Sequence, residues 1–338
     1  MKHDSIIRKW SLGLYLTGLA LCTSCSAIYD YEGDCEPHYR VEFRYDRNLK
    51  FADAFASEVK SVSLYLFDGE GRFVRRFDDS GEALASGSYS MPVDVEPGDY
   101  RMVTWAGLKD HPHFSVPELT PGVSTIDELR CTMARTDADG YGIVSEDLNN
   151  PQALFNGYTE EQRFPSCEGE HVIPVSLTKN TNNVRVVLQQ LSGEDLNAED
   201  FRFRIEAHNG TMNYDNALLT DEPLIYEPWD IRTGEAGTVG GGKLKVAVAE
   251  FTMGRLVMED SPVLTVTDSD GETVARIPLI DYALLVKGNY RKEMSDQEYL
   301  DRQDEYELVL FLDQNYKWDE VHIMINSWAL VLDHQTVG

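Results

Sequence analysis

Two cysteines near the start of the 338-residue chain carry the clearest covalent chemistry in the sequence. A basic start precedes the apolar run 10–21, which is too short to span a membrane and is typical of a signal peptide. The run leads into Cys22-Thr-Ser-Cys25, where small residues precede a cysteine as in a bacterial lipobox. We therefore expect lipidation of Cys25, with residues 1–24 as the lipoprotein signal peptide and 25–37 as an acidic tether.

The motif departs from the usual lipobox at Cys22, because a leucine is common at that position. Cys22 is the poorer lipidation site, since Leu21 before it is too large for the signal peptidase. The alternative is a plain secretory signal with incidental cysteines. Acidic residues at 30, 32 and 34 resemble the surface-export signal of Bacteroidetes lipoproteins. Because the acyl chains of a lipidated cysteine need no further anchor, we expect a lipid-anchored, surface-exposed protein of the outer membrane.

Other suggestive stretches do not complete a catalytic or metal-binding motif. Gly237 to Lys243 has the spacing of a phosphate loop, but Leu244 occupies the place of the Mg²⁺-binding Ser or Thr, which indicates a hairpin loop. Asp137 to Gly142 begins like a calcium loop, but Tyr141 and Leu148 stand where oxygen ligands are needed. The sequence contains no Gly-x-Ser-x-Gly and no His-Glu-x-x-His. We predict no catalytic residue, no metal site and no cofactor.

Three cysteines, Cys35, Cys131 and Cys167, remain after lipidation. Thiols outside the cytoplasm tend to oxidise, so one disulfide is expected and one cysteine is left over. The pair that we predict is Cys131 with Cys167.

The charge of the chain excludes one class of partner. Its 58 Asp and Glu against 30 Lys and Arg give a formal net charge of −28 at pH 7, so a nucleic-acid backbone would be repelled. Disorder is excluded by 17 Tyr, 13 Phe and 5 Trp, which supply ample material for a core.

Alternation of apolar and charged residues dominates the rest of the sequence. It is clearest at 39–45, 201–205 and 306–312, and it is typical of strands with one face on a core. Asp68-Gly69 and Asp270-Gly271 predict hairpin turns between such strands. We therefore predict an all-β protein with two tandem antiparallel β-sandwiches.

Only short helices are expected, and the length suits two domains. Thr125-Ile-Asp-Glu128 and Ser295-Asp-Gln-Glu298 are capping boxes, which predict one or two helices of two or three turns. The region 135–170 is rich in Gly, Asp, Asn and Glu, and strands resume at Val172. We place the domain boundary there, with an N-terminal sandwich over 38–168 and a C-terminal one over 169–338.

Several sequence segments, taken in order, resemble the FimB-type fimbrial anchor lipoproteins of Bacteroidales over almost the whole mature chain. They are Asp34–Pro37, Val62–Gly69, Pro97–Tyr100, Val103–Gly107, Leu154–Gly157, Gln297–Arg302 and Ile325–Trp328.

This resemblance implies transthyretin-like, Greek-key sandwiches and a role as the membrane-tethered subunit of a fimbria. Pilin subunits are the implied partners, joined by a strand that completes a neighbour's sheet. For this contact we predict the C-terminal stretch Trp328, Ala329, Leu330, Val331 and Leu332. The alternative is that Ala329–Leu332 forms an internal core strand.

A second function class remains open, that of a surface lipoprotein whose sandwiches bind glycans. It predicts a shallow row of exposed aromatic rings, for which the candidates are Tyr141, Tyr158, Tyr214, Tyr226 and Trp229. An enzyme, such as a surface hydrolase, lacks a recognisable set of catalytic residues.

Overall fold

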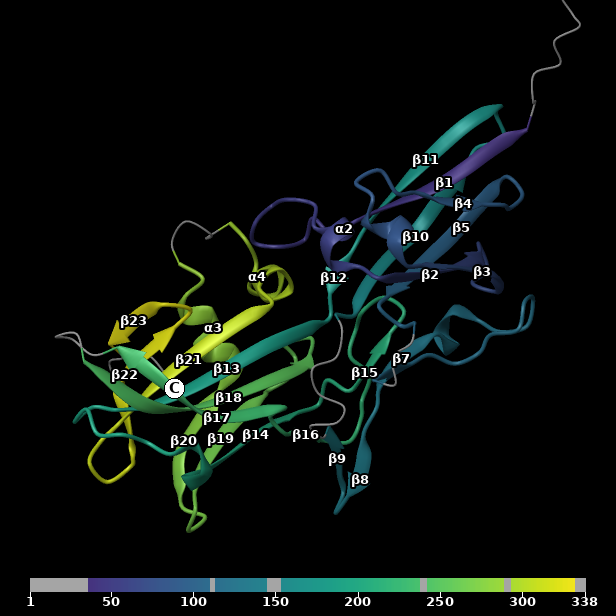
Figure 1. Cartoon of the computed structure of the whole chain (residues 1–338). Helices are drawn as coiled ribbons and strands as arrows, with labels where there is room; N and C mark the ends of the chain where they lie inside the picture. The colour runs from purple at the N-terminus through teal and green to yellow at the C-terminus, as the bar shows by residue number, and fades with distance from the viewer. Residues whose placement is uncertain (1–35, 110–112, 145–152, 238–241, 289–292, 332–338) are drawn as a thin grey trace, which may run out of the picture.

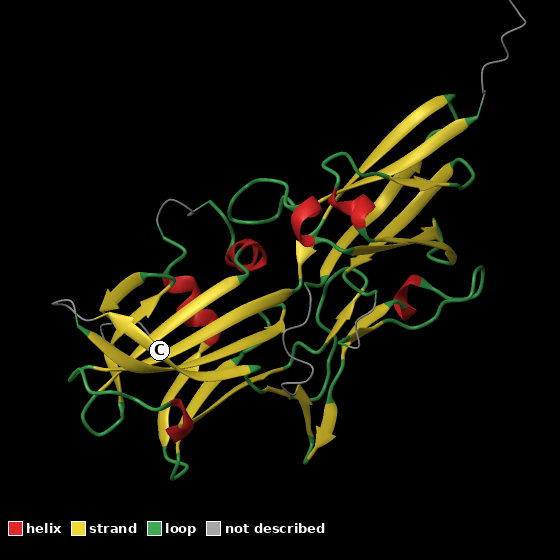
Figure 2. Cartoon of the chain, viewed as in Figure 1, coloured by secondary structure: helices red, strands yellow, loops and turns green. Residues whose placement is uncertain are grey.

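The computed structural model describes residues 36–109, 113–144, 153–237, 242–288 and 293–331, and its regular structure consists mainly of strands (Figure 2). The strands form two sandwiches, one at the upper right and one at the lower left of Figure 1. The all-β prediction is therefore confirmed.

The first sandwich packs a three-stranded sheet on a five-stranded sheet. The smaller sheet has the order β11 (Gly169–Ser176), β1 (Pro37–Arg44), β4 (Met91–Val93), and the larger one β12 (Thr178–Lys179), β10 (Phe155–Phe164), β5 (Gly98–Ala106), β2 (Ser61–Asp68), β3 (Phe73–Ser80). The alternation at 39–45 becomes β1, whose Tyr39, Val41 and Phe43 are buried in the core between the sheets.

The second sandwich has two six-stranded sheets. One has the order β17 (Asp230–Gly237), β18 (Lys243–Gly254), β13 (Thr181–Gln190), β21 (Glu305–Leu312), β22 (Trp318–Ile325), β23 (Trp328–Val331). The other has β20 (Thr273–Pro278), β19 (Val263–Asp268), β14 (Phe201–Ala207), β16 (Leu224–Tyr226), β9 (Tyr141–Val144), β8 (Thr136–Ala138). Apolar residues that alternate along β13, β14 and β21 fill the core between them.

A crossover segment that contains β6 (Phe114–Ser115), β7 (Arg130–Met133), β8 and β9 joins the two bodies. β6 and β7 form a small sheet with β15 (Thr211–Asn213), in the order β15, β7, β6, whereas β8 and β9 add to the second sandwich. This segment explains why β2 is buried on both faces: Leu64 and Leu66 contact the first core, whereas Tyr65 and Phe67 belong to the second.

The pairing moves the predicted domain boundary. β11 pairs with β1 along its whole length, so a break at residue 168 falls inside the first sandwich, which continues to Lys179 in β12. The polar stretch 135–170 was misleading because residues 136–144 belong to the crossover, whereas 155–164 form β10 and 169–170 begin β11. The composition of a stretch indicates whether its residues are exposed to solvent. The partner of a strand depends instead on contacts with residues that are distant in sequence.

The prediction of purely antiparallel sheets is also wrong. β1 with β11, β13 with β21 and β16 with β9 are parallel pairs. Each joins strands far apart in sequence, as parallel pairing requires a long connection.

Three hairpins share one turn chemistry. The Oδ1 atoms of Asp68, Asp268 and Asp313 each accept hydrogen bonds from the backbone N–H groups two and four residues later. The predicted turns at Asp68-Gly69 and Asp270-Gly271 are confirmed by the antiparallel pairs β2–β3 and β19–β20.

The short helices differ in part from the prediction. Ser295 caps α4 (Asp296–Arg302) as expected, by accepting a hydrogen bond from the backbone N–H of Glu298. Thr125 opens only a 3₁₀ turn, Ile126–Glu128, because the apolar side chains beyond it are drawn into β7. The helices α2 (Phe55–Glu58) and α3 (Leu279–Leu285) were not foreseen.

Candidate assembly surface

The C-terminal strand β23 lies at the edge of a six-stranded sheet, next to β22. Among the described strands it has a partner on one side only, so it is an edge strand and not the internal core strand of the alternative. An edge strand presents unpaired backbone donors and acceptors to another chain.

A two-residue turn holds β23 in place. Asn326 and Ser327 both have positive φ, 49° and 68°, which is the requirement of a type I′ hairpin. Asn326 also ties the turn to β21, since its Oδ1 accepts a 2.8 Å hydrogen bond from the backbone N–H of Glu307. The position of the edge is therefore set by backbone and side-chain contacts together.

The side chains of β23 divide between core and solvent. Trp328 is 57% exposed and Ala329 is exposed, whereas Leu330 packs against the core of the second sandwich. In a two-residue hairpin the residues that flank the turn exchange backbone hydrogen bonds, and bonding then alternates. Trp328 and Leu330 are thus bonded to β22, and the N–H of Ala329 points to the open edge.

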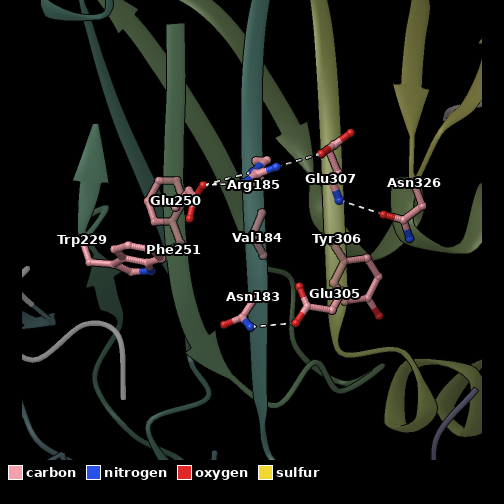
Figure 3. A pocket seen from close by; sticks show the side chains of 10 residues that line it. All are labelled: Asn183, Val184, Arg185, Trp229, Glu250, Phe251, Glu305, Tyr306, Glu307 and Asn326. Carbon is pink, nitrogen blue, oxygen red and sulfur yellow. Dashed lines mark hydrogen bonds and ion pairs between the residues drawn. The ribbon is translucent and has the colours of Figure 1, made fainter. Parts of the chain in front are cut away.

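A polar hollow of about 360 Å³ lies beside this hairpin on the same sheet (Figure 3). It extends from Asn326 across β21, β13 and β18 to Trp229. Its polar side chains form two hydrogen-bonded groups: Asn183 donates to Glu305 at 3.0 Å, and Arg185 lies between Glu250 at 2.8 Å and Glu307 at 3.4 Å.

The carboxylate of Glu250, on the β18 side of the hollow, also contacts Arg232 on β17. Burial alone would raise the pKa of Glu250, but hydrogen bonds from Arg232 and Arg185 outweigh it and lower the pKa. The contacts of Arg185 with Glu250 and Glu307 raise the pKa of Arg185. The carboxylate of Glu250 is thus paired with two guanidinium groups.

Several predicted residues can now be placed. Val331 lies on β23 with Trp328, Ala329 and Leu330, while Leu332 and Cys25 lie outside the described residues. No helix among the described ranges is long and apolar enough to cross a membrane. Within those ranges, no group of three His, Cys, Asp or Glu is arranged to hold a metal ion.

The predicted disulfide is corrected by the structure. Cys131 and Cys167 are both free thiols. Cys131 is fully buried on β7 in the core of the second sandwich, and burial strongly raises the pKa of its thiol. Cys167 is exposed beside β11 on the first sandwich. Sequence alone could not show that the two cysteines belong to different bodies.

The aromatic residues of the glycan alternative do not form an exposed row. Tyr226 is buried and its hydroxyl donates to Asn209, whereas Trp229 is half-buried at the end of the hollow. Tyr158 and Tyr214 pack edge to face, with ring centroids 5.3 Å apart. Tyr141 is half-buried on β9.

The hollow was missed by sequence reasoning. Its carboxylates and its arginine come from three separate strands, and in the sequence each is only the polar member of an alternating pattern. The one available signal was that Arg185, Glu250 and Glu307 stand on solvent-facing positions of long strands.

Comparisons with known proteins agree with this architecture. A candidate adhesin of Bacteroides thetaiotaomicron is 32% identical, with a TM-score of 0.79 over 89% of this chain and 100% of that chain. A candidate polysaccharide-binding protein of the same bacterium is 30% identical, with a TM-score of 0.78 over the same shares of both chains.

The third relative is the minor fimbrium anchoring subunit Mfa2 of Porphyromonas gingivalis. It is 22% identical over 267 residues, which are 78% of this chain and 76% of that protein. The solved fimbrial anchor protein Mfa2 shares the fold, with a TM-score of 0.65 over 88% of this chain and 100% of that chain, at 16% identity. The model of the family of fimbrillin-A associated anchor proteins Mfa1 and Mfa2 matches residues 31–334, and the chain belongs to this family.

Proposed function

We propose that this chain is a non-enzymatic anchor subunit of a fimbria. A lipid on Cys25 holds it to the outer membrane, and β23 joins it to a pilin subunit by strand pairing. The observation that carries the second part is the open edge of β23, which is held by a tight turn and shows an exposed Trp328. Main-chain hydrogen bonds along such an edge supply affinity, and side chains on alternate positions supply specificity.

The arrangement of the two ends supports this role. In Figure 1, β1 begins at the upper right end of the molecule, and β22 and β23 lie at the opposite, lower left end. The chain from Cys25 to Pro37 spans at most roughly 40 Å when extended. A membrane attachment through this tether therefore acts at the end of the molecule away from the proposed pilin contact.

The hollow next to β23 adds a polar surface to the contact. Glu250 and Glu307 bond the guanidinium group of Arg185, and Glu305 bonds the amide of Asn183, so these carboxylates are fixed before any partner binds. Such a preorganised arrangement costs little conformational entropy on association, so it contributes to partner choice and register.

Replacing Cys25 by Ala in the native cell tests the tether. We expect the protein to leave the membrane fraction, and electron microscopy to show fimbriae shed into the medium or grown abnormally long. Unchanged fimbriae together with a released protein would overturn the anchor proposal and lead to glycan-binding assays. The similarity to a candidate polysaccharide-binding protein supports that alternative.

Replacing Ala329 by proline tests whether pilin binds through the edge of β23. Ala329→Pro removes the N–H that faces away from β22, whereas the control Ala329→Val keeps that donor and the β-propensity of the strand. We expect the proline variant alone to lose binding to pilin, while both variants retain the far-ultraviolet circular dichroism of the parent. Equal pilin binding by the two variants would place the contact elsewhere.

A further inference from the structure

A large part of the outer face of the five-stranded sheet in the first sandwich is shielded from water. Its apolar side chains there are Tyr65, Phe67, Phe73, Val103 and Trp105, and each is at most 5% exposed. They belong to one apolar core with the crossover segment and the second sandwich, whereas the first sandwich has a separate core on the other face of this sheet. We propose that the two sandwiches and the crossover segment unfold as one cooperative unit, so that neither sandwich opens away from the other in the native protein.

The crossover segment supplies the apolar side chains that complete this shared core. They are Phe114, Ile126, Leu129, Cys131 and Met133, and each is at most 5% exposed. In Figure 1, β7 lies between the first sandwich and the hairpin of β8 and β9. Withdrawal of the segment from the sheet would expose both sets of side chains to water, and the cost grows with the apolar area exposed. For side chains of this size and number, that cost is at least as large as the whole stability of an ordinary domain.

Backbone hydrogen bonds tie the crossover segment to the hairpin of β2 and β3. The N–H of Phe73 donates to the carbonyl oxygen of Ser124, and the N–H of Gly122 donates to the carbonyl oxygen of Phe73, both at 2.8 Å. The N–H of Ile126 donates to the carbonyl oxygen of Gly71, also at 2.8 Å. The segment is therefore attached to the first sandwich by its main chain as well as by apolar contact.

The same segment is hydrogen-bonded to the second body. β7 pairs antiparallel with β15, and β9 pairs parallel with β16. The N–H of Met133 donates a 2.8 Å hydrogen bond to the carbonyl oxygen of Gly210. A movement of the second sandwich away from the first would thus have to break one of these two sets of backbone hydrogen bonds.

A second link joins the two bodies at another place. The carbonyl oxygen of Arg302, at the end of α4, accepts a 3.2 Å hydrogen bond from the N–H of Leu49. The Nη1 of Arg302 donates at 3.2 Å to the carbonyl oxygen of Asp46. In Figure 1, α4 lies on one side of β12 and the crossover segment on the other. Rotation about the chain at β12 would therefore strain at least one of the two links.

The consequence for anchoring rests on the function proposed above. A pull between the tether before β1 and a pilin at β23 acts across both sandwiches. Because the sandwiches open only together, both cores resist such a pull at once. The cooperativity is tested on this protein alone, so its failure is separate from a failure of the anchor proposal.

The thiol of Cys131 is a natural reporter of any separation, because it is 0% exposed and belongs to the shared core. N-ethylmaleimide reacts with a thiol only when the thiol is accessible. The full mature protein is incubated with this reagent at urea concentrations below the unfolding transition, and the label is measured on the tryptic peptide Cys131–Arg135. Cys167 is exposed, so its immediate labelling shows that the reagent is active.

We expect Cys131 to be labelled only through global unfolding. The free energy of the opening that exposes Cys131, and the urea dependence of that free energy, should equal the values for global unfolding followed by circular dichroism. A clearly weaker urea dependence of Cys131 labelling would show that the crossover segment opens by itself, and this result would overturn the proposal.

A cavity in the first core tests whether its effect reaches the second sandwich. Leu64→Ala removes a fully buried side chain that belongs to the first core alone. We expect hydrogen exchange of the slowest amides to become about thirtyfold faster or more, by the same factor in β1 of the first sandwich and in β13 of the second. The control is Val172→Ala, at a side chain of β11 that is 53% exposed, which should change neither strand.

Val62→Ala leaves a smaller cavity in the same core, and it serves the same comparison if Leu64→Ala does not fold. Faster exchange in β1 with unchanged exchange in β13 would show that the sandwiches unfold independently. That result would overturn the proposal even if Cys131 stays protected.

Discussion

The Nζ of Lys179 lies 2.6 Å from the Oδ2 of Asp304 and 3.1 Å from the Oε2 of Glu58, so one ammonium group joins the two sandwiches. Glu58 ends α2 of the first sandwich, Asp304 precedes β21 of the second, and Lys179 lies at the junction. Burial alone would lower the pKa of Lys179, but the two carboxylates outweigh it and raise the pKa. The lysine is therefore charged and paired although its side chain is only 10% exposed.

Lys179→Met should destabilise the protein, because two carboxylates at the junction lose their counter-ion. We expect a loss of about 1–3 kcal/mol in the free energy of unfolding, measured with urea. The control is Lys243→Met, which breaks the pair of Lys243 with Glu235 on the surface and should cost less than about 0.5 kcal/mol. Equal losses in the two variants would contradict the role of Lys179.

A glycine next to the junction is required by close packing. Gly107 has φ +93°, and a Cβ at this position would collide with the backbone carbonyl oxygen of Ala153. Gly81 has a similar φ of +95° but open space around it. We expect Gly107→Ala to cost about 3 kcal/mol or more and Gly81→Ala about 1–2 kcal/mol. Thermal unfolding of both variants separates the steric cost from the cost of the φ angle, and a similar loss in each would refute the collision.

A buried ion pair in the crossover segment predicts a pH dependence. The Nη2 of Arg135 lies 2.8 Å from the Oδ2 of Asp221, and both side chains are nearly buried. Burial alone would raise the pKa of Asp221, but hydrogen bonds from Glu222, Thr211 and Arg135 lower it to about 2. A lowered folded-state pKa stabilises the protein above the unfolded value of about 4, and this contribution is lost as the pH falls towards 2.

Urea unfolding between pH 5 and pH 2 measures this contribution. The parent should lose about 1–2 kcal/mol through Asp221, and Asp221→Asn should remove that part of the pH dependence. Asp94→Asn is the control, since Asp94 is almost fully exposed, and it should leave the pH dependence of the parent. If Asp221→Asn loses as much stability between pH 5 and pH 2 as the parent, the lowered pKa of Asp221 is contradicted.

The elements that the sequence predicted are those whose signals are local. The alternation at 39–45 and at 306–312 reports which face of a strand is buried, and Asp68 and Ser295 act on backbone groups within a few residues. The 3₁₀ turn at Ile126 shows the limit, because a capping box starts a helix but does not decide its length.

What could not be predicted depends on pairing across the chain. Nothing in the residues of β11 shows that β1 is its partner, and the boundary at 168 was misplaced for that reason. The same applies to Cys131, whose burial depends on the crossover of β7 to the second body. The edge position of β23 likewise follows from the order of the whole sheet rather than from its own apolar sequence.

The turn before β23 carries a conformational cost that one substitution can relieve. Ser327 has φ 68° in a type I′ turn, where glycine is favoured at the second central position. A residue with a Cβ costs about 1–2 kcal/mol in the left-handed region, while glycine costs roughly 0.5–1 kcal/mol in unfolded-chain entropy. Ser327→Gly should therefore stabilise the protein by about 0.5–1 kcal/mol.

Chemical unfolding of the parent, Ser327→Gly and Ser86→Gly tests this expectation. Ser86 is exposed with φ −75°, so its glycine variant gains no relief and should be slightly less stable than the parent. A loss of stability in Ser327→Gly would show that the turn does not adopt the I′ form. Because Asn326 and its bond to Glu307 are unchanged in this variant, β23 keeps its position, and pilin binding through the edge should be retained or strengthened.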